Sequence, residues 1–247
     1  MIPIIYHTGL TPPPSMNIDD FEICHYPVLK VEYESSNMPQ DISDILQFNP
    51  IVLMMSKNAV IGLDKWLAHF GLGSDFFACN NFWTVGDRTH ACLMNFLGIP
   101  SFYPDTMTGE GVLQSLQKQN HSRVLIISGQ NPRQDFIEGL SSAGINFFHF
   151  AVYQTSYAVS SEFSTNFKNS KSNYLIITSP SAVGGILRSL SLLDLSRLKC
   201  RIISIGPTTS AAIRQNGGDV FLESDVPNIN ALYDSLDKLI AESSYAY

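Results

Sequence analysis

The sequence has no long apolar run, no cluster of cations and no closely spaced cysteines, and each absence excludes a class of protein. No apolar stretch approaches the ~18–20 residues that a membrane-spanning helix needs. Lysine and arginine number 15 against 22 aspartates and glutamates, and without a basic cluster we expect no nucleic-acid partner. The four cysteines lack C-x-x-C spacing, so we expect free thiols rather than disulfides or metal ligands.

Familiar catalytic patterns are missing too. The six histidines show no i,i+4 or clustered spacing, so we expect no metal site. No paired carboxylates, nucleophile elbow or Walker loop are visible. The opening segment lacks the basic stretch of a signal peptide and is typical of a first strand, so we expect a cytoplasmic protein.

The most informative feature that is present is a long internal repeat. The pattern at Ser56–Val60 returns at Ser179–Val183, and that at Val85–Thr89 returns at Ile205–Thr209. The offsets are 123 and 120 residues, far more than the roughly 20–50 residues of a solenoid repeat. The repeat therefore predicts a duplicated domain, and each repeated element is a strand that passes through Gly or Ser into a helix.

Apolar strand-like runs alternate with helical patterns, which indicates α/β architecture with mainly parallel sheets. We predict two similar three-layer domains. The second copy has too few strands after Tyr153, so we expect it to take its first strands from the N-terminus. This predicts a discontinuous domain, 1–33 with 156–247, and an inserted domain, 36–153. Two connecting strands, Val28–Tyr33 and Phe150–Tyr157, would then permit hinge motion about a cleft.

Six short motifs carry a resemblance to a known family. They are Met55–Val60, Thr84–Thr89, Ser128–Arg133, Val152–Thr155, Thr178–Val183 and Ile205–Thr209. No single one is specific, but in this order they resemble the uroporphyrinogen-III synthase family. That family has two α/β domains in the discontinuous layout described above.

The resemblance implies a lyase that acts on hydroxymethylbilane, a flexible linear tetrapyrrole with eight carboxylates. Such an enzyme closes the macrocycle with inversion of ring D and loss of water, giving uroporphyrinogen III. It works as a monomer without a cofactor, mainly by orienting the substrate and shielding a cationic intermediate. A transient contact with the preceding, bilane-forming enzyme is a further expectation.

The resemblance assigns the chemical role to Tyr153. It matches the family's cleft tyrosine, whose hydroxyl can hydrogen-bond the departing hydroxyl and assist the loss of water. A phenol is a poor acid at neutral pH but an adequate positioned donor. The alternative is a strand tyrosine that packs at the junction of the domains, beside Tyr157 and Tyr174.

The remaining predicted site residues would receive the substrate's carboxylates at helix N-termini. The hydroxyls of Thr89 and Thr209 occupy equivalent first turns, and the serines sit at the parallel turns. Each could equally serve only as a helix cap. Arg133 could form a bidentate pair with a carboxylate. The predicted binding set is Ser56, Gly86, Thr89, Gly129, Arg133, Ser179, Ser181, Gly206, Thr208 and Thr209.

The N-terminus departs from the family pattern. Thr8 is followed by Gly9 and Leu10 where the family has Arg-Pro, and the prolines within Thr11–Ser15 cannot lie inside a helix. We expect the helix between the first two strands to be shortened or lost. This leaves open an inactive family member. Because a fold alone does not imply a function, two further alternatives are a two-lobed protein that binds an anionic metabolite and a two-domain glycosyltransferase, for which 247 residues is short.

Overall fold

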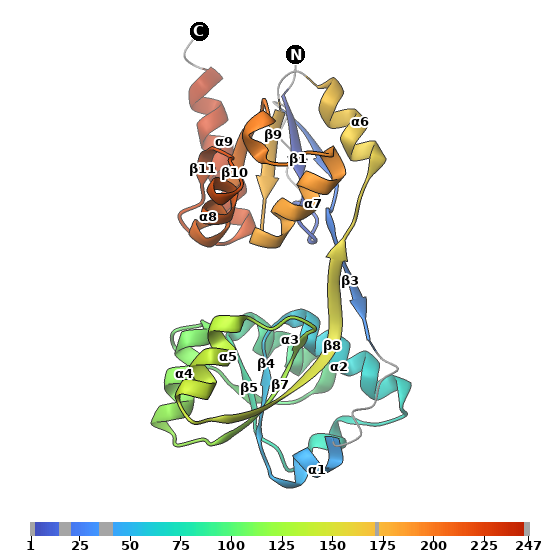
Figure 1. The fold of residues 1–247 in the computed structure, drawn as a ribbon, viewed down its shortest axis with the longest axis vertical. Coiled ribbons are helices and arrows are strands. Elements are labelled where there is room, and N and C mark those ends of the chain that lie inside the picture. The colour runs from blue at the N-terminus through green and yellow to red at the C-terminus, as the bar shows by residue number, and fades with distance from the viewer. Residues whose placement is uncertain (1–2, 15–20, 35–41, 171–172, 245–247) are drawn as a thin grey trace. The chain divides into compact units, whose positions relative to one another are not determined.

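The structure is a computed structural model that describes residues 3–14, 21–34, 42–170 and 173–244 (Figure 1). The chain forms two compact units, Met1–Lys30 with Ser156–Tyr247 (unit 1) and Val31–Thr155 (unit 2). The predicted domain boundaries differ from these by a few residues, and the independence of the two domains stays a prediction. The expected loss of the first helix falls mostly on residues 15–20, outside the described residues, while residues 11–14 are not helical.

Unit 2 contains a six-stranded sheet. Across the sheet the strands are β3 (Leu29–Tyr33), β8 (Asn146–Tyr157), β7 (Arg123–Gly129), β4 (Ile51–Met54), β5 (Phe82–Thr84) and β6 (Ser101–Phe102). All pairs from β8 to β6 are parallel. The four residues of β4 are all buried, as the apolar run that encodes a central parallel strand requires.

Helices cover both faces of this sheet. The helices of unit 2 are α1 (Ile42–Gln47), α2 (Lys57–His69), α3 (Asp87–Leu97), α4 (Gly109–Lys118) and α5 (Gln134–Ser142), with a 3-10 turn η1 (Ser74–Phe77). One core cluster joins the sheet to α2 and α3 through Leu63, Trp66 and Leu93. The other joins it to α4 and α5 through Leu116 and Leu140. The unit is therefore a three-layer α/β structure (Figure 1).

Unit 1 contains a five-stranded parallel sheet. Its order is β11 (Val220–Glu223), β10 (Arg201–Ser204), β9 (Asn173–Ile177), β1 (Ile4–His7) and β2 (Glu22–His25). One face packs on α6 (Ser161–Asn169), α7 (Pro180–Leu190), η2 (Leu195–Arg197) and α8 (Pro207–Gln215). The other packs on α9 (Ile229–Ser244) through Leu232, Tyr233 and Leu236.

Five strands have the same arrangement in space in the two sheets, although their order along the chain differs. In unit 1 the chain order across the sheet is 2-1-3-4-5 when counting starts at β1, which is a doubly wound arrangement. In unit 2 the equivalents of the first two strands, β7 and β8, come last in the chain. The predicted fold class, two similar three-layer α/β units with mainly parallel sheets, is confirmed. The strand order reverses between β4 and β7 in unit 2, and between β1 and β9 in unit 1.

A pair of glycines shows how closely the copies correspond. Gly62 in α2 and Gly185 in α7 are 123 residues apart, the same offset as Ser56 and Ser179. A Cβ added at Gly62 would lie 2.7 Å from the carbonyl oxygen of Val152 in β8. One added at Gly185 would collide with the carbonyl oxygen of Val28. In each copy the helix thus rests directly on backbone atoms, those of β8 at Val152 in unit 2 and those just before β3 at Val28 in unit 1, which only glycine permits.

Gly62→Ala and Gly185→Ala should each lower the free energy of unfolding by about 1–3 kcal/mol, because backbone atoms cannot move aside for the new methyl group. Urea denaturation measures this change. Gly139→Ala in α5 is the matched control, since its Cβ would meet only the end of the flexible Leu113 side chain. There the higher helix propensity of alanine should leave stability unchanged or slightly increased. Equal stability of all three variants and the wild type would contradict the close packing.

Candidate active site

Most of the predicted site residues of unit 2 meet at the carboxyl edge of its sheet. β4 leads through Ser56 into α2, β5 leads through Gly86 into α3, and β7 ends at Gly129. Ser56 and Gly129 flank the point between β4 and β7 where the strand order reverses. Ligands of open parallel sheets bind outside the carboxyl ends of the strands at such a point.

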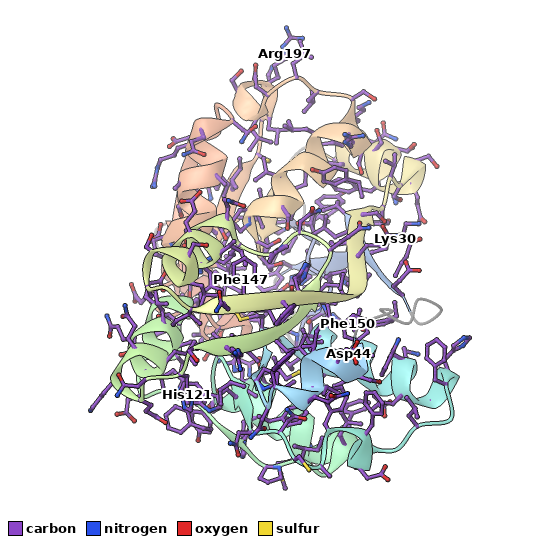
Figure 2. All side chains as sticks on the ribbon, turned by 60° about the horizontal axis from the view of Figure 1, so that its bottom comes forward. Lys30, Asp44, His121, Phe147, Phe150 and Arg197 are labelled. Atoms are coloured by element: carbon purple, nitrogen blue, oxygen red, sulfur yellow. The ribbon has the colours of Figure 1, made fainter. Side chains whose placement is uncertain are left out.

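Tyr153 owes its direction to an irregularity in β8. Phe150, labelled in Figure 2, and Val152 are buried in the cluster beneath α2, so strict alternation would turn Tyr153 to the opposite face. The pairing of β7 with β8 shifts, however: Ser128 pairs with Ala151, and Gly129 pairs with Tyr153. This bulge lets Tyr153 pack against the same cluster as Val152 and directs it to the side of α2.

Three groups hold the half-buried Tyr153. Its hydroxyl lies 3.2 Å from Ser56 Oγ. Its ring lies against Gly129, where an added Cβ would be 2.8 Å from two ring carbons. Its carbonyl oxygen accepts the N–H of Gln130 at 2.9 Å. Tyr33 of β3 stands close by: burial raises the pKa of Tyr33, and the neighbouring Tyr153 raises it further.

The Val/Ile-Gly turns have the same internal structure in both copies. Thr84 Oγ1 donates to the Gly86 carbonyl at 3.1 Å, and Ser204 Oγ donates to the Gly206 carbonyl at 3.0 Å. Thr89 N and Thr209 N bond these same two carbonyls, each at 3.1 Å. The duplication predicted from sequence therefore extends to individual hydrogen bonds.

Within these turns the predicted residues differ in exposure. Thr89 and Thr209 are buried, at 5% and 3% exposure, whereas Thr208 is exposed. Gly86 is needed for packing, because a Cβ there would lie 2.9 Å from Met107. A Cβ at Gly206 would meet only Pro227, at an ordinary 3.5 Å. Glycine at 206 is thus not required by its protein neighbours.

The serine turns of the two copies are not alike. Ser56 caps α2 by accepting the N–H of Ala59 at 3.2 Å. Ser179 begins α7 with a similar extended backbone but makes no side-chain cap bond; its Oγ lies 3.2 Å from Oγ of the exposed Ser181. In unit 1 the hydroxyls of Ser179 and Ser181 therefore lie near each other, whereas in unit 2 the hydroxyl of Ser56 lies near Tyr153.

Arg133 already has protein partners. Its guanidinium donates to Asp135, and it also bonds Glu110 at 3.2 Å, with 60% of the side chain exposed. The hydrogen bond from Arg133 is the main cause that lowers the pKa of Asp135. A substrate carboxylate at Arg133 would have to displace these two acids.

Sequence reasoning missed His7, which ends β1 at the switch point of unit 1. The ring is fully buried. Nε2 lies 3.0 Å from the Thr11 carbonyl oxygen and must carry the proton, so Nδ1 accepts from the Tyr233 hydroxyl at 3.0 Å. Burial lowers the pKa of His7 to about 4, and the nearby His25 adds to the effect. The only signal in the sequence was a histidine at the end of an apolar run.

Two cavities of unit 2 lie elsewhere. One of about 550 Å³ is lined by Ile51, Phe82 and His121, and one of about 650 Å³ by Arg123, Asn146 and Phe147. Figure 2 labels His121 and Phe147. These residues mark the amino ends of the strands, opposite the edge that holds Tyr153. The cavities therefore do not belong to the candidate site.

Two kinds of feature are absent from the described part of the chain. No group of three or more histidine, cysteine, aspartate or glutamate side chains there is placed to hold a metal ion. None of its helices is both long and apolar enough to span a membrane.

The fold and the repeated turns define a class of protein: two doubly wound parallel α/β units, one inserted into the other along the chain. Within that class the chain belongs to the uroporphyrinogen-III synthase (HemD) family, whose model matches residues 18–234. The substrate of this family is hydroxymethylbilane, and the chain is a cyclising lyase of haem biosynthesis.

Solved structures agree on the fold. Uroporphyrinogen-III synthetase from Helicobacter pylori matches with a TM-score of 0.68 at 18% identity, over 97% of this chain and 100% of that one. A mutant uroporphyrinogen III synthase from the extremely thermophilic bacterium Thermus thermophilus matches with a TM-score of 0.62 at 12% identity, over 97% and 99%. A comparison with curated protein sequences finds no match.

The buried His7 should make stability depend on pH. Unfolded histidine has a pKa near ~6.5, so below that pH the unfolded chain takes up a proton that folded His7 refuses down to about 4. Stability is thus complete above pH ~6.5 and falls by about 2 kcal/mol by pH 5. Urea unfolding at pH 7 and 5 measures it, and His7→Gln should lose this part of the pH dependence. Identical pH dependence in both proteins would refute the assignment.

Gly129→Ala should push the Tyr153 ring away from Ser56. Since misplacement by about 1 Å costs up to about 100-fold in rate, we expect at least a tenfold loss of kcat for uroporphyrinogen III formation. A thermal unfolding curve reports whether the fold survives. A folded Gly129→Ala protein with the wild-type rate would show that the position of the ring does not matter.

Proposed function

We propose that Tyr153 is the proton donor in the cyclisation of hydroxymethylbilane to uroporphyrinogen III by this chain. The observation that supports it is the Tyr153 hydroxyl, held 3.2 Å from Ser56 Oγ at the carboxyl edge where the strand order reverses. The phenol is half-buried, so a ligand at this edge can reach it while its ring stays fixed against Gly129.

The cyclisation needs few catalytic groups from the protein besides the Tyr153 hydroxyl, because most of the reactivity resides in the substrate. The C–O bond of the terminal hydroxymethyl group breaks, its electron pair leaves with the oxygen, and the pyrrole nitrogen supplies electrons to form the azafulvene cation. Tyr153 hydrogen-bonds the leaving oxygen and passes its proton to it as the C–O bond breaks, so that the oxygen departs as water. The substituted carbon of ring D then attacks the cation, and rearrangement of the spiro intermediate inverts the ring. The proton that ring D loses when the macrocycle closes returns to the phenolate.

The repeated turns are proposed to receive the substrate's carboxylates. The first N–H groups of α2, α3, α7 and α8 have no intrahelical acceptor and lie at the positive ends of their helix dipoles. Both copies present them at the carboxyl edge of a parallel sheet. The proposed binding residues are those predicted from sequence: Ser56 takes part through the backbone N–H groups of the helix that it caps and not through its hydroxyl, Thr208 and Ser181 are exposed to solvent, and Arg133 is shared with Glu110 and Asp135.

The setting is part of the same proposal. We propose a cytoplasmic monomer that works without a cofactor and has no nucleic-acid partner, consistent with a net charge of −7. The substrate cyclises spontaneously without inversion, so a transient contact with the enzyme that makes it would shorten its time free in solution.

Freshly generated hydroxymethylbilane, followed by resolution of the oxidised porphyrin isomers, tests the function. Isomer III is expected from the wild type. Tyr153→Phe should then lower kcat by about tenfold or more, the worth of one hydrogen bond to developing charge, with little change in the unfolding free energy. Isomer I alone from the wild type would leave a two-unit binding protein or an inactive family member as the better explanation. An undiminished Tyr153→Phe rate would remove the role of the phenol.

A further inference from the structure

The Ser56 hydroxyl contacts both the N-terminus of α2 and the phenol of Tyr153. Its oxygen accepts the Ala59 N–H at 3.2 Å and lies 3.2 Å from the Tyr153 oxygen. A serine hydroxyl has one proton and two acceptor positions. Because Ala59 occupies one acceptor position, the proton of Ser56 remains available for Tyr153.

We infer that Ser56 is a positioning residue that donates its hydroxyl proton to the Tyr153 oxygen, so that the phenol proton is directed to the ligand. If Tyr153 instead donated to Ser56, its single proton would be occupied by the protein and lost to the leaving group. The N–H of Ala59 polarises the Ser56 hydroxyl and makes it a better donor, since linked hydrogen bonds strengthen one another. The relay runs from Ala59 N–H through Ser56 to Tyr153.

The relay gives the bulge in β8 and the glycines a common purpose. The shift between Ser128 and Gly129 turns Tyr153 toward α2, and Gly129 leaves room for its ring. Gly62, one and a half turns into α2, lets the helix rest on the Val152 backbone. Together these contacts fix the distance between Ser56 and Tyr153, the residue after Val152.

Nothing equivalent exists in the described part of unit 1. Ser179 corresponds to Ser56, and Gly185 corresponds to Gly62. Gly185 lies against Val28 as Gly62 lies against Val152, so the position of Tyr153 is taken in unit 1 by Leu29, which is buried in the core. Ser179 Oγ lies beside Ser181 Oγ instead of an aromatic hydroxyl. The relay is thus an addition to one copy and not a general consequence of the repeated turn.

Three substitutions separate donation from helix capping, because each keeps a different part of what serine does. Ser56→Thr keeps both the cap and the hydroxyl donor. Ser56→Asp keeps the cap, since aspartate is as good an N-cap as serine, but has no proton to donate when ionised. Ser56→Ala loses both. Ser160→Ala is the matched control: Ser160 caps α6 by accepting the Phe163 N–H at 3.1 Å.

The inference rests on the proposed function and is tested by kcat, KM and the thermal midpoint. Ser56→Thr should retain kcat. Ser56→Asp should retain the midpoint yet lose about tenfold in kcat, the value of one hydrogen bond. Ser56→Ala should lose both with KM nearly unchanged, and Ser160→Ala should lower only the midpoint. Wild-type kcat in Ser56→Asp would reduce Ser56 to a helix cap. A raised KM at constant kcat in Ser56→Ala would make it a substrate ligand instead.

A spectroscopic measurement separates failure of this inference from failure of the proposed function. In protein labelled with [ζ-13C]tyrosine, the Tyr153 signal is identified by its loss in Tyr153→Phe. It should move in Ser56→Ala and Ser56→Asp, but not in Ser56→Thr or Ser160→Ala. This holds whether or not the wild type makes isomer III. An unmoved signal in Ser56→Ala would show that no such hydrogen bond exists.

Discussion

The close approach of α2 to β8 is the constraint on which the candidate site depends. Gly62 brings the helix onto the Val152 carbonyl, and the bulge beside Gly129 then turns the next residue, Tyr153, toward the start of that helix. The cluster around Trp66 and Val152 supplies the burial that holds the helix and the strand together. The phenol is therefore positioned by the rigid core of unit 2 and not by a loop.

The two copies share the turns that begin their helices, and they differ at the position of Tyr153. The same hydrogen bonds recur at Thr84 and Ser204, so both copies offer helix N-termini that favour anions. The proposed function assigns these positions to the eight carboxylates of the substrate and a single donor to its leaving hydroxyl. At the place where unit 2 carries Tyr153, unit 1 carries the buried Leu29. The two copies therefore differ at this position: unit 2 has a half-buried phenol, and unit 1 has a leucine packed in its core.

Sequence patterns predicted the α/β class, which the structure confirms, because apolar periodicity is a local signal. The discontinuous layout, and the role that the family resemblance gives to Tyr153, stay predictions. The patterns did not predict the bulge in β8, which interrupts a pairing register with β7 that is regular from Asn146 to Ala151. Nor did they predict that Arg133 is paired with two acids or that His7 is buried and neutral. Those properties depend on residues distant in the chain, such as Glu110 and Tyr233, that meet only after folding.

The N-terminus shows how the fold tolerates departure from the family's first turn. Where the family has an arginine after the first strand, the described chain has Gly9, held against Thr178 and the His7 ring so closely that no side chain would fit. His25 donates to the Gly9 carbonyl at 2.8 Å, and Tyr233 fixes His7 from α9. The buried His7 and the half-buried His25 thus support this turn through hydrogen bonds. Any contribution of the turn to carboxylate binding must then come from backbone N–H groups rather than from a cationic side chain.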